Sequence, residues 1–236
     1  MIAIWAVAGM LAGMLVNLGA DLLPSRQPLR KALLCPDCGE RRPSVRWPAA
    51  LSFLLERHRP YCNAPLPWRA LGAELALAGI WAVGWHLLGP SPQLWLFSLH
   101  TAVFALVFVV DLEHRLVLNR VTMGGGLLAL AGSLVWKVPP PLHGVLGGAL
   151  GFLILLVIAL AKPGAMGMGD VKLAGLIGLV VGFPGVLPAL AVGIIAGGVG
   201  AAAMLLTGRA RRGSYLPYAP FLVTGAMVVM VQASRI

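Results

Sequence analysis

The sequence predicts an all-α protein, a polytopic membrane helix bundle of about eight transmembrane helices with a small cytoplasmic loop insert that contains cysteines. Hydrophobic residues make up 59% of the 236 residues and charged residues only 11%, whereas soluble domains carry about 25% charged residues. The mean hydropathy is +0.88. Apolar stretches close to the roughly 20 residues that a spanning helix needs recur along the chain. The bilayer is therefore the solvent in which this fold has to be understood.

Eight apolar segments account for the predicted helices. The sixth segment is short for a span, so a kink near Phe183-Pro184 would leave seven helices instead of eight. Glycines four residues apart, such as Gly9 with Gly13 and Gly147 with Gly151, are typical of close helix contacts in lipid. The segments are Ile2–Leu23, Ala70–Leu88, Leu94–Val110, Val121–Trp136, Leu142–Ala161, Val171–Phe183, Val186–Thr207 and Leu216–Val231.

The chain divides into a first transmembrane helix (1–23), a polar insert (24–69) and a transmembrane bundle (70–236). The insert holds all three cysteines, nine Lys and Arg residues and eight prolines. Because proline disfavours long helices, we expect the insert to be small and rich in loops.

Basic residues predict the orientation, because cytoplasmic loops are enriched in Lys and Arg. With the N-terminus outside and eight helices, only Lys137 and Arg235 of the 18 Lys and Arg residues lie outside. The insert is then cytoplasmic and the C-terminus is outside. This asymmetry also explains the net charge of +10, so no nucleic-acid partner is expected.

Asp111 and Asp170 are the candidate catalytic residues. Asp111 ends the third apolar segment and Asp170 begins the sixth, so both are predicted at the cytoplasmic boundary. Two carboxylates close together in a poorly hydrated site cannot both ionise cheaply, which raises one pKa of the pair and leaves one shared proton. Such a pair can activate water and protonate a carbonyl, as in aspartic proteolysis.

Simpler interpretations exist for each aspartate. Asp111 could be a carboxylate at a helix end that pairs with His114 or Arg115. Asp170 could be a helix N-cap or a first-turn acid, which are common at that position. Glu113 lies two residues further into the predicted loop, where we expect it to be solvated.

Gly167 and Gly169 flank Met168 directly before Asp170. Glycine permits positive φ and a close approach of another chain, so we expect these two residues to shape a turn and a substrate channel. Lys172 is expected to hold the loop or a substrate carbonyl.

The run from Gly167 to Lys172 resembles the Gly-x-Gly-Asp-x-Lys motif of type IV prepilin leader peptidases, which are membrane aspartic proteases. The resemblance covers most of the chain. Asn119 departs from the family's proline, and Ala219 departs from its glycine. Further matching features are Asn17 to Arg26, Cys35-Pro36-Asp37-Cys38, Glu74, Asp111 to Leu118 and Pro217-Tyr218-Ala219-Pro220.

The resemblance implies a peptidase of the bacterial inner membrane. Its substrates would be type IV prepilins or pseudopilins, cleaved on the cytoplasmic side between a short basic leader and an apolar helix. Proteolysis would need no cofactor. Many members also N-methylate the new N-terminus with S-adenosylmethionine. The resemblance also marks Glu74 as a candidate site residue.

A zinc site is one interpretation of the cysteines. Cys35 and Cys38 have zinc-knuckle spacing, and structural zinc usually takes four protein ligands. The family's second Cys-x-x-Cys is incomplete here, because Pro65 follows Cys62 at the partner position. His58 or, less favourably, Asp37 could complete the site. The alternative is a site that has lost its metal and keeps three free thiols.

A different class of function is a proton-coupled transporter that uses the aspartates as a relay. It predicts acids near the middle of the bilayer and an internal repeat. The two aspartates lie at one boundary and no repeat is evident, which favours the peptidase. A structural protein with incidental aspartates is a third interpretation.

Overall fold

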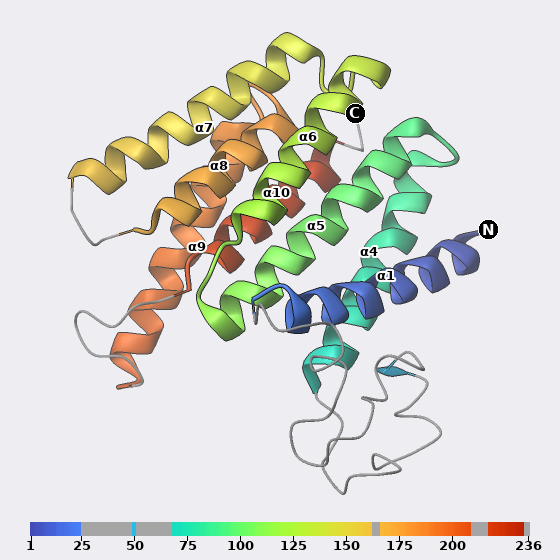
Figure 1. Cartoon of the computed structure of the whole chain (residues 1–236), viewed down its shortest axis with the longest axis horizontal. Helices are drawn as coiled ribbons and strands as arrows, with labels where there is room; N and C mark the ends of the chain where they lie inside the picture. The colour runs from blue at the N-terminus through green and yellow to red at the C-terminus, as the bar shows by residue number, and fades with distance from the viewer. Residues whose placement is uncertain (25–48, 51–67, 162–165, 209–216, 234–236) are drawn as a thin grey trace, which may run out of the picture. The chain divides into compact units, whose positions relative to one another are not determined.

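The computed structural model describes residues 1–24, 49–50, 68–161, 166–208 and 217–233 (Figure 1). Eight α-helices run through these residues, which confirms the all-α class. They are α1 (Ile2–Leu22), α4 (Trp68–Leu88), α5 (Pro92–His114), α6 (Asn119–Trp136), α7 (Pro141–Ala161), α8 (Met168–Val181), α9 (Val186–Leu206) and α10 (Ala219–Ala233).

Five of these helices, namely α1, α4, α5, α7 and α9, are long and apolar enough to cross a membrane. The other three are shorter or more polar. Helix α8 has only 14 residues, which corresponds to about 21 Å of rise, whereas the hydrocarbon core is about 30 Å thick. The chain is therefore a multi-pass helical protein. Helices α6, α8 and α10 are part of it, but they are not both long and apolar enough to count as candidate spans.

The break between α8 and α9 is real, so the alternative of seven helices is wrong. Helix α8 ends where Gly182 takes a φ of +71°, which is a conformation that glycine adopts without strain. The Gly182 N–H still donates to the Gly178 carbonyl at 2.9 Å, and the Phe183 N–H donates to the His143 carbonyl at 2.9 Å. The turn is thus tied to α7, and a new helix begins at Val186.

The described chain forms two compact units, Met1–Val109 and Val110–Ile236, so that α5 begins in the first and ends in the second. The predicted insert, 24–69, lies almost wholly outside the described residues, and the predicted domain boundaries stay predictions.

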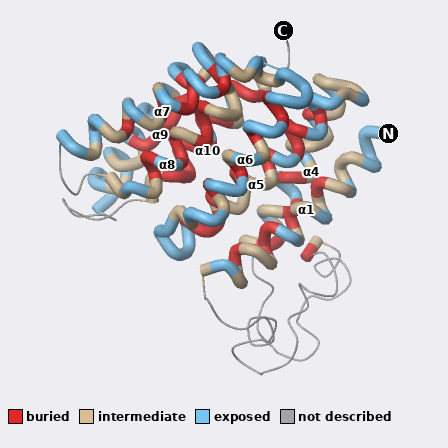
Figure 2. Tube along the Cα trace, turned by 45° about the horizontal axis from the view of Figure 1, so that its top comes forward, coloured by how far each residue is buried: buried red, intermediate tan, exposed pale blue. Residues whose placement is uncertain are grey.

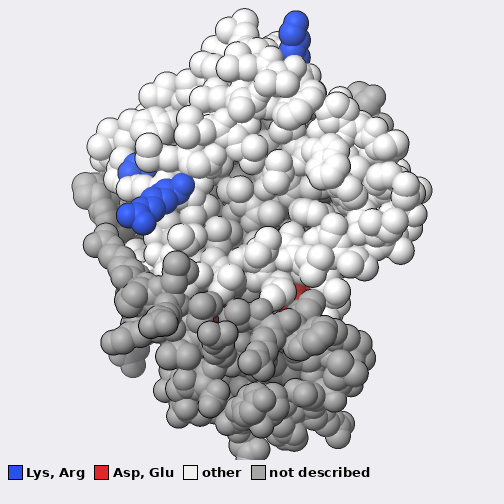
Figure 3. All heavy atoms as spheres, turned by 45° about the vertical axis from the view of Figure 1, so that its right-hand side comes forward, with Lys and Arg blue, Asp and Glu red and all other residues white. Residues whose placement is uncertain are grey.

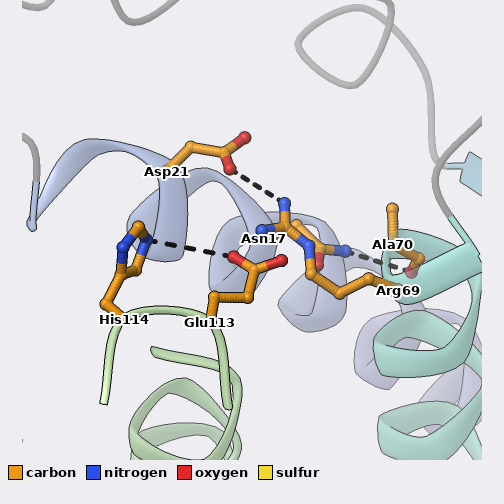
Figure 4. Close-up of polar contacts among 6 residues, drawn as sticks. All are labelled: Asn17, Asp21, Arg69, Ala70, Glu113 and His114. Carbon is orange, nitrogen blue, oxygen red and sulfur yellow. Dashed lines mark hydrogen bonds and ion pairs between the residues drawn. The ribbon is translucent and has the colours of Figure 1, made fainter. Parts of the chain in front are cut away.

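In the first unit, α1 packs on α4 through the predicted glycine pair. A Cβ on Gly13 would lie 2.5 Å from the Cα of Glu74, so only glycine allows this approach. The two polar residues of α1 also bind the beginning of α4 (Figure 4). Asn17 Nδ2 donates to the Ala70 carbonyl at 3.1 Å, and Asp21 pairs with Arg69 at 2.9 Å.

In the second unit, α8 is the central element. It packs most extensively on α7 and also contacts α6, α9 and α10, and much of its length is buried (Figure 2). A Cβ on Gly178 would collide with the backbone of Gly147, and one on Gly151 would collide with the carbonyl of Ala174. The predicted contact face at Gly147 and Gly151 is therefore confirmed as the α7–α8 interface.

The described surface on the face drawn in Figure 3 is almost free of charged side chains. Large apolar residues such as Leu127, Leu160 and Ile195 are exposed. A surface of this kind is expected where lipid replaces water, because charged groups facing lipid are costly.

Candidate active site

Asp170 lies in the first turn of α8. Gly167 is the N-cap residue, with φ −79° and ψ 147°. Its N–H donates to Asp170 Oδ2 at 3.3 Å, and the Asp170 N–H donates to the Gly167 carbonyl at 3.0 Å. The local position is that of a first-turn acid, as the simpler interpretation predicts. However, the side chain is only 4% exposed, and a first-turn acid that serves only as a cap has no need to be buried.

Asp111 lies in the last turn of α5, which continues to His114. The helix therefore continues beyond the predicted third segment, which ends at Val110. The helix ends at His114, because the next residue, Arg115, takes a φ of +53°. Asp111 is 2% exposed, and the backbone N–H of Ala219 acts as a donor to its carboxylate.

One oxygen of Asp111 has no hydrogen-bond partner within the part of the chain that the structure describes. Its Oδ2 is buried and makes no hydrogen bond to any described residue. Buried polar atoms in proteins are almost always hydrogen-bonded, so each exception calls for an explanation. The explanation that fits this position is that Asp111 Oδ2 accepts a hydrogen bond from a bound molecule or exchanges a proton with it.

The two aspartates act on each other. The charge of Asp111 reaches the Asp170 carboxylate, although 58 residues separate the two in the chain. The last turn of α5 and the first turn of α8 each contribute one member. Two buried carboxylates that interact through their charges can hold a single shared proton.

The simpler interpretation of Asp111 receives little support. His114 contacts Glu113 at 4.0 Å instead (Figure 4). Arg115 acts on Asp111 through its charge, but no ion pair within 4.0 Å joins Asp111 to a described basic residue. The Glu113 side chain is 37% exposed, in line with the expected contact with water.

The two glycines of the motif do not use positive φ, so that part of the expectation is wrong. Gly167 is extended, and Gly169 lies inside the first turn of α8. What Gly169 provides is room, because a Cβ there would lie 2.9 Å from Cβ of Val117. The loop that follows α5 can therefore rest directly on the turn that carries Asp170.

Lys172 makes a second link between α8 and the residues after this loop. Its Nζ donates to Asn119 Oδ1 at 2.9 Å, at the first residue of α6. Asn119 is the residue that departs from the family's proline, and proline could not accept this hydrogen bond through a side chain. This hydrogen bond ties the beginning of α6 to α8, and a role of Lys172 toward a substrate stays a prediction.

Two residues near the pair, Tyr218 and Ala219, entered the sequence analysis only through the Pro-Tyr-Ala-Pro run and were not predicted as site residues. Tyr218 is partly buried, and its phenol lies within electrostatic range of Asp170. Its ring fills the space beside Gly197. The adjacent Ala219 supplies the N–H that faces Asp111. The Pro-Tyr-Ala-Pro run that opens α10 was the only sequence signal for this contribution.

Glu74 belongs to the first unit and serves as a structural anchor there. Its two carboxylate oxygens accept the N–H groups of Ala49 at 2.8 Å and Ala50 at 2.9 Å. A role for Glu74 in substrate binding stays a prediction. The predicted zinc ligands Cys35, Cys38, His58 and Cys62 lie outside the described residues. Within the described residues, no group of three or more His, Cys, Asp or Glu could hold a metal ion.

The fold and the buried aspartate pair define a multi-pass membrane protein with a candidate acid–base site. Residues 98–202, which include both aspartates, match the model of the type IV leader peptidase family. The prepilin leader peptidase/N-methyltransferase of Bacillus subtilis (strain 168) is 29% identical over 86% of this chain and 82% of its own length. The corresponding protein of Burkholderia pseudomallei (strain 1026b) is 29% identical over 89% of this chain and 70% of its own length. No solved structure matches the chain significantly.

These comparisons confirm the predicted resemblance to the type IV leader peptidase family, and with it a peptidase class of activity. The matched segment begins within α5 and ends within α9. It therefore includes the two helix ends that carry the aspartates, but not the insert or α10.

Gly169→Ala tests the packing of the loop on α8. The new Cβ would press on Val117, and such overpacking typically costs about 1–3 kcal/mol. We expect a lower unfolding temperature in detergent and reduced peptidase activity. Gly124→Ala is the matched control, because a Cβ there meets nothing within 4 Å.

Adding Val117→Gly to Gly169→Ala removes the opposing Cβ and should restore part of the lost stability. If Gly169→Ala behaves like the Gly124 control, the close contact with Val117 does not limit the turn.

Proposed function

We propose that this chain is a membrane aspartic endopeptidase that removes the leader from type IV prepilins or pseudopilins at the cytoplasmic boundary of the membrane. One observation carries the proposal, namely that Asp111 and Asp170 are both buried and act on each other's charge. The family match over residues 98–202 supports the same activity.

The pair can perform peptide hydrolysis by dividing two roles. The ionised carboxylate takes a proton from a water molecule, whose oxygen attacks the peptide carbonyl, while the neutral carboxyl gives its proton to the carbonyl oxygen. Collapse of the resulting tetrahedral species breaks the C–N bond, and the nitrogen leaves with a proton returned through the pair. Because the two groups share their protons, the roles belong to the pair rather than to either residue alone.

The surroundings assist the ionised form of each carboxylate. The Gly167 N–H at Asp170 and the Ala219 N–H at Asp111 stabilise negative charge, because hydrogen bonds to the ionised form favour it. The unpartnered Asp111 Oδ2 leaves an acceptor available for the water or for the substrate.

A proton-coupled transporter fits the second unit poorly. A relay through the bilayer needs ionisable residues along its depth. In residues 110–236 the only acids are Asp111, Glu113 and Asp170, and all three lie in the last turn of α5 or the first turn of α8. No carboxylate lies on α6, α7, α9 or α10 to continue a path.

Separate Asp111→Asn and Asp170→Asn variants test the pair. General acid–base groups contribute about 10²–10⁴-fold to rates, so we expect each variant to lose at least about 100-fold in cleavage of a co-expressed prepilin. Glu113→Gln is the matched control, because Glu113 is an exposed acid two residues from Asp111. Normal cleavage by either aspartate variant, at equal protein level, would eliminate the pair as the catalytic centre.

We further propose that the chain lies in the bacterial inner membrane with its N-terminus outside and the cysteine insert in the cytoplasm. The support is the distribution of basic residues, of which only Lys137 and Arg235 fall on the outer side.

The three cysteines are the only ones in the chain and report this orientation. After chelation of any bound metal, a membrane-impermeant maleimide should label them in inverted vesicles but not in right-side-out vesicles. In a cysteine-free background, Lys137→Cys should give the opposite pattern. Labelling of the native thiols from the outer face would reverse the proposed orientation.

Two finer proposals concern the insert and the cofactors. The names of the two relatives include N-methyltransferase activity, which supports S-adenosylmethionine as a second substrate here. Zinc held by Cys35, Cys38, Cys62 and His58 rests on ligand type and spacing alone.

Cys35→Ser separates these proposals from proteolysis. We expect the purified variant to lose bound zinc and the mature product to lose N-terminal methylation, while leader cleavage stays within about twofold. An unchanged zinc content would eliminate Cys35 as a ligand, and purified wild-type protein without zinc would eliminate the metal site.

A further inference from the structure

Arg115 follows the last turn of α5, four residues after Asp111. Its N–H donates to the Asp111 carbonyl at 2.9 Å, and its φ of +53° is uncommon for a residue with a side chain. The backbone at this helix end would favour glycine, so the guanidinium needs a separate explanation. The residue is exposed, but its charge reaches the buried Asp111 carboxylate.

The helix ends alone would place the shared proton on Asp111. The last turn of a helix carries a partial negative charge, which disfavours a carboxylate and favours a cation. Asp111 lies in such a turn at the end of α5. Asp170 lies in the first turn of α8, where the partial charge is positive. A positive charge beside Asp111 therefore counteracts the unfavourable end of α5.

The other contacts of Asp111 act in the same direction as Arg115. The Ala219 N–H at the beginning of α10 donates to the carboxylate, which favours the ionised form. The buried Oδ2 has no partner among the described residues, so a proton on it would be a buried donor without an acceptor, which is costly. The neighbouring Glu113 and His114 contact each other. The surroundings of Asp111 therefore suit a carboxylate that is ionised.

Among the described residues, no second cation is placed to favour an ionised Asp170. Lys172 is about 200° around the axis of α8 from Asp170, and its amine binds the first residue of α6. The other basic residue on α6, Arg120, is exposed. Helices α9 and α10 carry no ionisable residue, and α7 carries only His143, whose ring contacts the turn after α8. The Tyr218 phenol near Asp170 carries no positive charge.

We propose that Arg115 is a positioning residue that keeps the shared proton of the pair on Asp170. Asp111 is then the carboxylate that takes the proton from water, and Asp170 is the carboxyl that gives its proton to the substrate carbonyl oxygen. The proposal rests on the proposed peptidase function and orders the two roles within it. The pair still titrates as a unit, and Arg115 determines which of its two one-proton forms prevails.

The positive φ of Arg115 allows its charge to be removed without disturbing the turn. Arg115→Gly eliminates the charge, and glycine adopts this conformation without strain. Arg115→Lys retains the charge, which is sufficient because no ion pair within 4.0 Å joins the guanidinium to Asp111. Lys137→Gly is the matched control, because Lys137 is also basic, takes a φ of +55° and follows the end of α6.

The pH profile of kcat/KM for a prepilin precursor in detergent tests the role of the charge. Without the cation the pair loses its first proton less readily, so at low salt the acidic limb of Arg115→Gly should lie about half a pH unit higher, on the scale of exposed ion pairs. Arg115→Lys should restore the wild-type limb, and Lys137→Gly should retain it. At about 1 M salt, where the screening length is about 3 Å, wild type and Arg115→Gly should coincide.

Two results of this comparison have different consequences. Acidic limbs of wild type and Arg115→Gly that coincide at low salt, or an equal displacement in Lys137→Gly, would overturn the role of Arg115. A wild type that cleaves no precursor at any pH would instead overturn the peptidase function.

Chemical labelling locates the proton without any turnover. A diazo reagent takes the proton of a neutral carboxyl, releases nitrogen and leaves an ester, which mass spectrometry assigns to a residue. We expect the ester mainly on Asp170 in the wild type. The ratio of Asp170 ester to Asp111 ester should fall about threefold in Arg115→Gly at low salt, which corresponds to half a pH unit. An ester mainly on Asp111 in the wild type, or an unchanged ratio in Arg115→Gly, would overturn the proposal.

Discussion

The burial of two carboxylates in an apolar helical unit is the constraint on which the second unit depends. Removing a carboxylate from water is costly unless hydrogen bonds or opposite charges compensate it. Helix ends provide that compensation here. The Gly167 N–H at the beginning of α8 faces Asp170, and the Ala219 N–H at the beginning of α10 faces Asp111. Both N–H groups are among the donors that have no hydrogen-bond acceptor within their own helix. Each contact therefore gives a helix-end N–H its acceptor and at the same time stabilises a buried carboxylate.

The glycines of α7 and α8 explain how this arrangement can be built within a membrane. There is little hydrophobic drive between helices in lipid, so close packing has to hold them together. Gly147 and Gly178 let the two backbones touch, and Gly182 ends α8 with a positive φ after only 14 residues. A helix that short, held on several sides, places its first turn where α5 ends. Gly169 then allows Val117 to rest on that turn.

Sequence patterns predicted the helices well because each pattern is local. Apolar length and breaker residues located all eight helices. The errors arose where tertiary contacts decide. Helix α5 passes through Asp111 because Arg115, not Asp111, leaves the helical conformation. Gly167 and Gly169 were expected to adopt positive φ. Instead, glycine is needed at position 169 because a side chain there would collide with Val117. Tyr218 and Ala219 are distant in the chain from both aspartates, and the Pro-Tyr-Ala-Pro run marks them without indicating which residues they contact.

Two contacts hold α8 to the segment between α5 and α6. Lys172 of α8 donates to the Asn119 side chain at the beginning of α6, and Gly169 leaves room for Val117 beside the first turn of α8. This segment directly follows the last turn of α5, which carries Asp111, and the first turn of α8 carries Asp170. Both contacts therefore fix the two helix ends that provide the carboxylates before any other molecule binds. Groups that are already held in position do not have to be brought together during the reaction, which lowers the entropic cost of that step.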